Sequence, residues 1–115
     1  MFEPSYIKEF FKKSKEWLKI YKEISLAPSN SKFQKKLQSN YAEGCTKIKE
    51  MQAIANSPVA IKNKTELLNE CDIWNKELQE IYAAALQNNV AEATRLRDST
   101  IIVFSMWESS KKYLR

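Results

Sequence analysis

The feature that most constrains the fold is an apolar run near the end of the chain. Between Thr100 and Trp107, five of the six residues are large and apolar, and no other stretch gathers as many such side chains. The run is far shorter than the roughly 20 apolar residues that a transmembrane helix needs. We therefore expect protein to bury it, against amphipathic helices supplied by the rest of the chain.

The scarcity of turn residues favours those helices over a β fold. The chain of 115 residues contains one Gly and three Pro, whereas an all-β fold would need many more turn residues. A chain of this length can bury a core of its own. We predict a single domain over residues 1–115, made of helices with short links.

The helix limits follow from apolar periodicity and from cap residues. Apolar residues recur at intervals of three and four, as in amphipathic helices, over residues 4–26, 31–56, 63–87 and 89–114. Pro4 suits a first turn, Ser31 and Gln34 form a capping box, and Asn63 and Asn89 each precede a Glu by three residues. Because the link 87–89 is very short, the last two helices must pair antiparallel. The expected fold class is all-α, a four-helix antiparallel up-down-up-down bundle.

The same periodicity predicts which side chains form the core. In the first helix they are Ile7, Phe10, Ser14, Trp17, Tyr21 and Ile24; in the last they are Ala93, Leu96, Thr100, Val103, Phe104, Trp107 and Leu114. Trp74 completes the set of three core tryptophans. Gly44 lies in mid-helix, where it costs about 1 kcal/mol relative to Ala, so we expect a backbone or an aromatic ring to pack closely against it.

Some apolar residues of the last helix face away from that core. On a helical wheel Ile102 points nearly opposite to the core direction, and Met106 and Tyr113 lie close to it. Apolar groups on the solvent side suggest a surface for a protein partner or a homodimer. Scattered surface hydrophobic residues, or a thicker core, are the alternatives.

A second candidate surface is basic. The first helix carries Lys8, Lys12, Lys15, Lys19 and Lys22 within one narrow sector. Residues 1–64 hold 13 Lys and 6 acids, which gives +7, whereas residues 65–115 give −2. This face is either simply solvated or binds an anionic surface. Nucleic acid is disfavoured, because the chain has only three Arg and no helix-turn-helix pattern.

The sequence points to no catalytic, cofactor or metal site. Histidine is absent, which removes the commonest general base and metal ligand. Glu66 and Glu70 are four residues apart, but di-iron bundles use a Glu-x-x-His motif that this chain lacks. Cys45 and Cys71 lie on apolar stripes, so we expect buried free thiols, with a disulfide as the alternative. We therefore expect a protein that is not an enzyme.

The second half of the chain resembles a known class of bacterial protein. The pattern begins with a helix break at Pro58 and continues with Leu67-Leu68, Trp74, Leu78 and Ala85. After the link Gln87-Asn88-Asn89 it ends with Ala93 and Leu96. Over residues 58–114 this pattern is similar to the helical domains of Gram-positive (Bacillus-type) lipoproteins of unknown function. The resemblance implies a surface-exposed domain from which a lipidated N-terminus has been removed. Size, charge and helicity give a looser similarity to bacteriocin immunity proteins, which are small, basic, cytosolic four-helix bundles.

Two functions are therefore expected from the sequence. The first is a non-catalytic interaction module, working through Ile102, Met106 and Tyr113, as the exposed domain of a bacterial surface lipoprotein. The second is a small basic cytosolic immunity-like or inhibitor protein that binds an anionic or protein partner through the lysine face. The chain as it stands carries no signal segment, which favours the cytoplasm, whereas a trimmed mature domain would lie at the cell surface.

Overall fold

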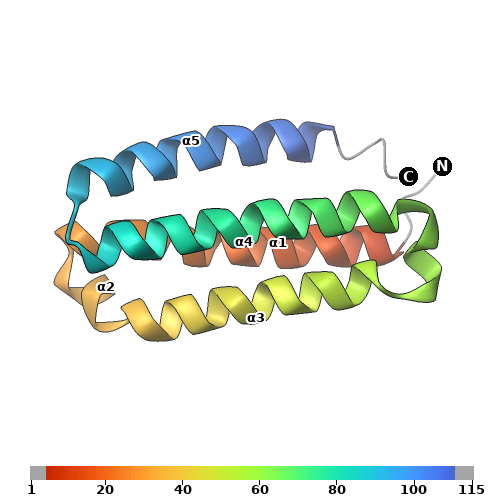
Figure 1. The fold of residues 1–115 in the computed structure, drawn as a ribbon, viewed down its shortest axis with the longest axis horizontal. Coiled ribbons are helices and arrows are strands. Elements are labelled where there is room, and N and C mark those ends of the chain that lie inside the picture. The colour runs from red at the N-terminus through yellow and green to blue at the C-terminus, as the bar shows by residue number, and fades with distance from the viewer. Residues whose placement is uncertain (1–4, 111–115) are drawn as a thin grey trace.

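The chain is all-helical wherever the structure describes it. The computed structural model describes residues 5–110. Its four long helices are α1 (Ser5–Leu26), α3 (Leu37–Ala55), α4 (Lys64–Leu86) and α5 (Val90–Ser109) (Figure 1). Three short helical segments connect them: η1 (Ala27–Ser29), α2 (Ser31–Lys35) and η2 (Pro58–Asn63). The expected all-α class is confirmed over this range.

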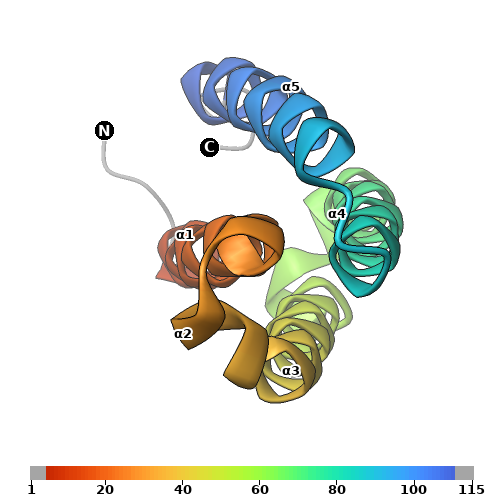
Figure 2. The same cartoon turned by 90° about the vertical axis from the view of Figure 1, so that its left-hand side faces the viewer.

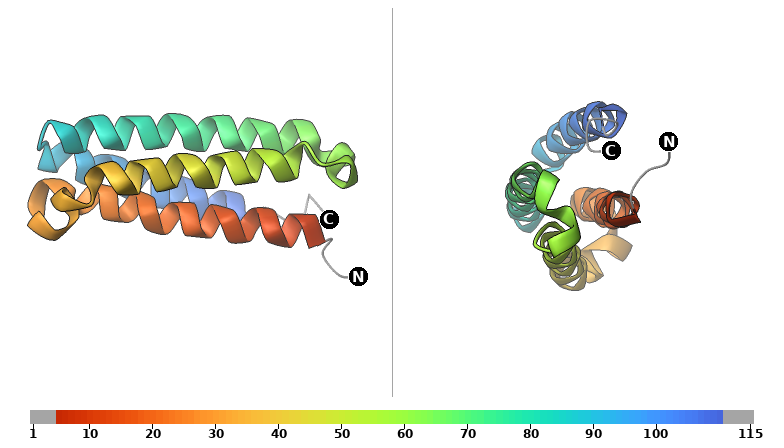
Figure 3. Two further views of the ribbon diagram at one scale, coloured as in Figure 1. Left: turned by 90° about the horizontal axis from the view of Figure 1, so that it is seen from below. Right: turned by 90° about the vertical axis from the view of Figure 1, so that its right-hand side faces the viewer.

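The long helices lie side by side around α1. In the end view, α3, α4 and α5 form an arc, with α3 and α5 at its two ends and α1 inside it (Figure 2). α1 packs against α3, α4 and α5, and its contact with α3 is the most extensive. Seen from below, α1 and α3 run alongside each other for most of their length (Figure 3). The core therefore lies between α1 and the inner side of the arc.

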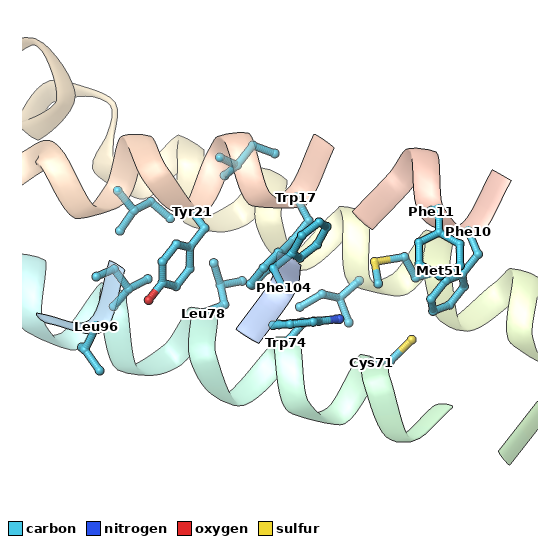
Figure 4. Close-up of a cluster of buried hydrophobic side chains, with 14 of the residues drawn as sticks. Phe10, Phe11, Trp17, Tyr21, Met51, Cys71, Trp74, Leu78, Leu96 and Phe104 are labelled. Carbon is cyan, nitrogen blue, oxygen red and sulfur yellow. The ribbon is translucent and has the colours of Figure 1, made fainter. Parts of the chain in front are cut away.

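Aromatic side chains from three helices meet in that core (Figure 4). The ring of Trp74 on α4 lies 5.2 Å from the ring of Trp17 on α1 and 5.4 Å from that of Phe104 on α5. Trp107 stacks on Phe11 at 4.5 Å. The core predicted for the first helix is confirmed: Ile7, Phe10, Ser14, Trp17, Tyr21 and Ile24 are all buried.

The predicted helix 31–56 is wrong in one respect, because it is broken at Lys36. α2 ends at Lys35 and α3 begins at Leu37, with Lys36 between them. α2 packs against η1 and α1, so the break redirects the chain from the end of α1 to the start of α3. The cap also differs from the predicted box: Asn30 is the N-cap, and its Oδ1 accepts a hydrogen bond from the Lys32 N–H at 3.0 Å.

Of the two remaining predicted caps, one is confirmed and one is wrong. The Asn89 side chain accepts a hydrogen bond from the Glu92 N–H at 3.1 Å and caps α5. Just before it, Asn88 has a φ of 52°, in the left-handed region that Asn tolerates. Asn63 makes no cap bond; η2 runs directly into α4 there, and the Asn63 amide instead donates to the Tyr6 hydroxyl at 2.8 Å.

Gly44 is closely packed, as predicted, but against aliphatic side chains. A Cβ at this position would lie 3.0 Å from both methyl carbons of Leu78 and 3.6 Å from Ile20 Cγ2. The expected backbone or aromatic neighbour is therefore wrong. The absence of a side chain here lets α3 approach α4 at the point where Leu78 fills the core.

Replacing Gly44 by alanine is expected to lower the free energy of unfolding by about 1 kcal/mol. Forcing a methyl group against a fully buried Leu78 costs about 1–3 kcal/mol, which exceeds the helix-propensity gain of about 1 kcal/mol. Urea unfolding followed by circular dichroism measures the change. Ala42→Gly, at an exposed position of the same helix, isolates the propensity part. A Gly44→Ala protein more stable than the parent would show that Leu78 moves aside freely.

Candidate functional site

The outer side of α5 exposes large apolar side chains. Ile102 is 61% exposed and Met106 is 68% exposed, whereas Tyr113 lies outside the described residues. Val103 is 46% exposed, so its prediction as a core residue is wrong. The rings of Trp74, Phe104 and Trp107 fill the space between α4 and α5, which leaves Val103 at the rim.

The register of α4 against α5 adds a fourth residue to this surface. The Thr100 hydroxyl donates to Glu77 Oε2 at 2.8 Å. Because the two helices run antiparallel, one turn forward on α5 corresponds to one turn back on α4. This brings Val103 to the level of Ile73 along the two helices, and Ile73 is 44% exposed. We call Ile73, Ile102, Val103 and Met106 the apolar outer face.

Glutamates of α4 border the apolar outer face. Glu66, Glu70, Glu77 and Glu80 are seven, three, four and seven residues from Ile73, so they share its side of the helix. Burial raises the pKa of Glu70. Further along the same seam, a shallow groove of about 280 Å³ is lined by Glu80, Glu92, Leu96 and three smaller or polar residues. By the same spacing Lys76, three residues from Ile73, and Arg95, seven residues from Ile102, also lie on these sides of α4 and α5. Among the described residues, acidic groups therefore outnumber basic ones around the apolar outer face.

The five lysines of the predicted basic face are all exposed. Within residues 5–110, Lys15 is the one member of this set that forms an ion pair, with Glu108 of α5 at 3.3 Å. The structure thus gathers the set on one side of α1.

A buried chain of hydroxyl groups was not predicted from the sequence. The Tyr21 hydroxyl lies 3.0 Å from Thr100 Oγ1, which in turn bonds Glu77. Since Thr100 has one hydroxyl hydrogen and gives it to Glu77, Tyr21 donates to Thr100. These two hydrogen bonds join α1, α5 and α4. In the sequence, the only sign of these hydrogen bonds was the polar residue Thr100 at a position expected in the core.

The two cysteines are free thiols, Cys71 buried and Cys45 half-buried. Burial, reinforced by the neighbouring acids Asp72 and Glu70, raises the pKa of Cys71 to about 12. A thiol that stays protonated at neutral pH is a poor nucleophile. Cys71 therefore acts as a small apolar core residue.

The comparisons with known proteins give no family. The chain matches no protein-family model, no curated protein and no solved structure. Within the described range, no three Cys, Asp or Glu side chains gather where they could hold a metal ion. None of the helices in residues 5–110 has the length and apolar character to cross a membrane.

Proposed function

We propose that this protein is a non-catalytic interaction module whose apolar outer face binds an amphipathic helix with basic flanks. The main support is that four exposed apolar residues are grouped on two adjacent helices. Single exposed apolar residues are normal, but a contiguous group rimmed by polar residues is typical of a protein-binding surface. An amphipathic helix laid on such a surface buries its apolar side chains against it.

The charge around the face supports a basic partner. Four α4 glutamates share the side of Ile73, against one α4 cation, Lys76, which lies three residues from Ile73. A second copy docked antiparallel through α5 would bring its own α4 glutamates against these, and like charges facing each other are unfavourable. A helix flanked by Lys or Arg would instead meet opposite charge.

Two further parts of this proposal concern the arrangement of the helices and a role at the cell surface. We propose that the helices form an up-down-up-down four-helix bundle in which the second helix is interrupted at Lys36. Reversal of direction between successive long helices supports it (Figure 1). The resemblance of residues 58–114 to lipoprotein helical domains supports a surface role.

Synthetic peptides test the proposed binding. The probe is an amphipathic Leu/Lys helix of about four turns, compared with a Leu/Glu peptide of the same pattern. We expect the Leu/Lys peptide to bind with a Kd on the order of 10 µM and the Leu/Glu peptide not to bind. Ile102→Gln combined with Met106→Gln should weaken binding about tenfold or more, measured by fluorescence anisotropy of a labelled peptide.

Leu86 provides a matched control on the other side of α4. It is 58% exposed and lies one turn beyond Tyr82, which stacks on Tyr41 of α3 at 4.0 Å. Leu86→Gln should leave binding unchanged. Equal weakening by Leu86→Gln would contradict the assigned face. A free protein that sediments as a dimer, and becomes monomeric in the double variant, would replace the basic partner with a second copy.

A further inference from the structure

The connector η2 exposes two apolar side chains at one end of the bundle. Val59 is 68% exposed, and Ile61 is 78% exposed, the largest fraction among the large apolar side chains of residues 5–110. η2 joins the end of α3 to the start of α4 and lies across that end of the molecule (Figure 3). These two side chains therefore belong neither to the core nor to the apolar outer face.

The fold holds η2 in place through its other side chains. Ala60 is fully buried and Asn63 is 6% exposed, and the Asn63 amide donates to the Tyr6 hydroxyl of α1 at 2.8 Å. A 3-10 helix has three residues per turn, so Ala60 and Asn63 lie on one face, which is turned to the bundle. Val59 and Ile61 lie on the two remaining faces and stay outside.

Each exposed apolar residue has a lysine one turn further on. The period of three places Lys62 after Val59 and Lys64 after Ile61, and both lysines are exposed. They are the only charged residues between positions 51 and 65. Among residues 5–110, neither forms an ion pair.

Acidic groups near this end are mostly paired with other cations. Glu50 of α3 lies 3.6 Å from the Lys13 ammonium and 3.5 Å from that of Lys47. Glu9 of α1 lies 3.8 Å from the same Lys13 ammonium. Glu66, in the first turn of α4, is the nearest acid along the chain from the two lysines of η2. Positive charge therefore accompanies the exposed apolar pair.

We propose that this end of the bundle docks on an anionic phospholipid membrane. Val59 and Ile61 enter the interfacial region, and Lys62 and Lys64 contact lipid phosphates. Apolar burial combined with electrostatic attraction is what binds peripheral proteins to such surfaces. A second copy docked end to end would instead bring the lysines of both copies together, which is unfavourable. The site is separate from the apolar outer face, so either can fail without the other.

Co-sedimentation with lipid vesicles tests the docking. The probe is phosphatidylcholine vesicles with about one-third phosphatidylglycerol, and pure phosphatidylcholine vesicles are the comparison. We expect the protein to bind the anionic vesicles, less at about 0.15 M salt than at low salt, and to bind the neutral vesicles weakly. No binding to the anionic vesicles, or equal binding to both kinds, would overturn the proposal.

Two changes in opposite directions test the apolar pair. Val59→Gln combined with Ile61→Gln should lower the vesicle partition coefficient about tenfold. Ile61→Trp should raise it, because indole rings favour the membrane interface, and a folding defect would not strengthen binding. Ile102→Trp places the same ring on the apolar outer face and should have no effect. An equal increase from Ile102→Trp would overturn the assigned docking site.

The lysines are tested against an equal charge change elsewhere. Lys62→Gln combined with Lys64→Gln should lower the partition coefficient about tenfold and reduce its dependence on salt. Lys12→Gln combined with Lys19→Gln removes two charges from the lysine face of α1 and should have a much smaller effect. Equal weakening by both pairs would attribute binding to overall charge and overturn the proposal.

Discussion

Replacing Trp74 by alanine is expected to lower the free energy of unfolding by about 4 kcal/mol. The Trp74 side chain is fully buried, and its ring is within 5.5 Å, centre to centre, of the rings of Trp17, Phe104 and Trp107. Truncation would open a large cavity where α1, α4 and α5 meet. Urea unfolding followed by circular dichroism measures the loss.

Trp74→Phe is the matched control. The Trp74 Nε1 is buried and has no hydrogen-bond partner among residues 5–110, so the exchange removes an unsatisfied donor while keeping an aromatic ring. It should cost less than half as much as the alanine substitution. Similar losses of unfolding free energy in Trp74→Ala and Trp74→Phe would mean that stability depends on the indole group itself rather than on the volume that an aromatic ring fills.

Replacing Thr100 by valine is expected to lower the free energy of unfolding by about 2 kcal/mol. Valine keeps the shape of threonine, but it removes the hydroxyl that joins Tyr21 to Glu77. The Tyr21 hydroxyl would then be buried without a partner, which costs about 1–3 kcal/mol. Thr100→Ser keeps the hydroxyl and should cost less. If Tyr21→Phe and Thr100→Val have strictly additive effects, the two hydroxyl groups are not coupled.

The pH dependence of the free energy of unfolding provides an independent check on the hydrogen bonds that join Tyr21, Thr100 and Glu77. Burial raises the pKa of Tyr21 well above its ordinary value, so the folded protein keeps the proton at a pH where the unfolded chain has lost it. The free energy of unfolding should therefore fall as pH rises above about 10, by up to about 1.4 kcal/mol per pH unit from this group. Tyr21→Phe should make that decline shallower; an unchanged slope would contradict a buried, protonated Tyr21.

Periodicity was sufficient to predict the long helices and the core stripe of α1, because helix spacing alone determines which α1 residues face one direction. It also placed Ile102 and Met106 on the outside of α5. It could not predict that Val103 would join them, because that depends on how much space the Trp74, Phe104 and Trp107 rings leave between two helices.

Features set by tertiary packing were missed for the same reason. Lys35 and Lys36 are good helix formers, so no local signal marked the break between α2 and α3. The hydrogen bonds that join Tyr21, Thr100 and Glu77 depend on the relative positions of three helices. Residue types along a single helix do not contain that information.

The distribution of the indole rings determines what an optical probe can report. One Trp lies on each of α1, α4 and α5, and all three meet in one cluster, whereas α3 has none. Intrinsic emission will follow the separation of those three helices as a single signal. A partial opening in which α3 alone detaches would change the ultraviolet signature of the Tyr41–Tyr82 stack while leaving the indole spectrum nearly constant.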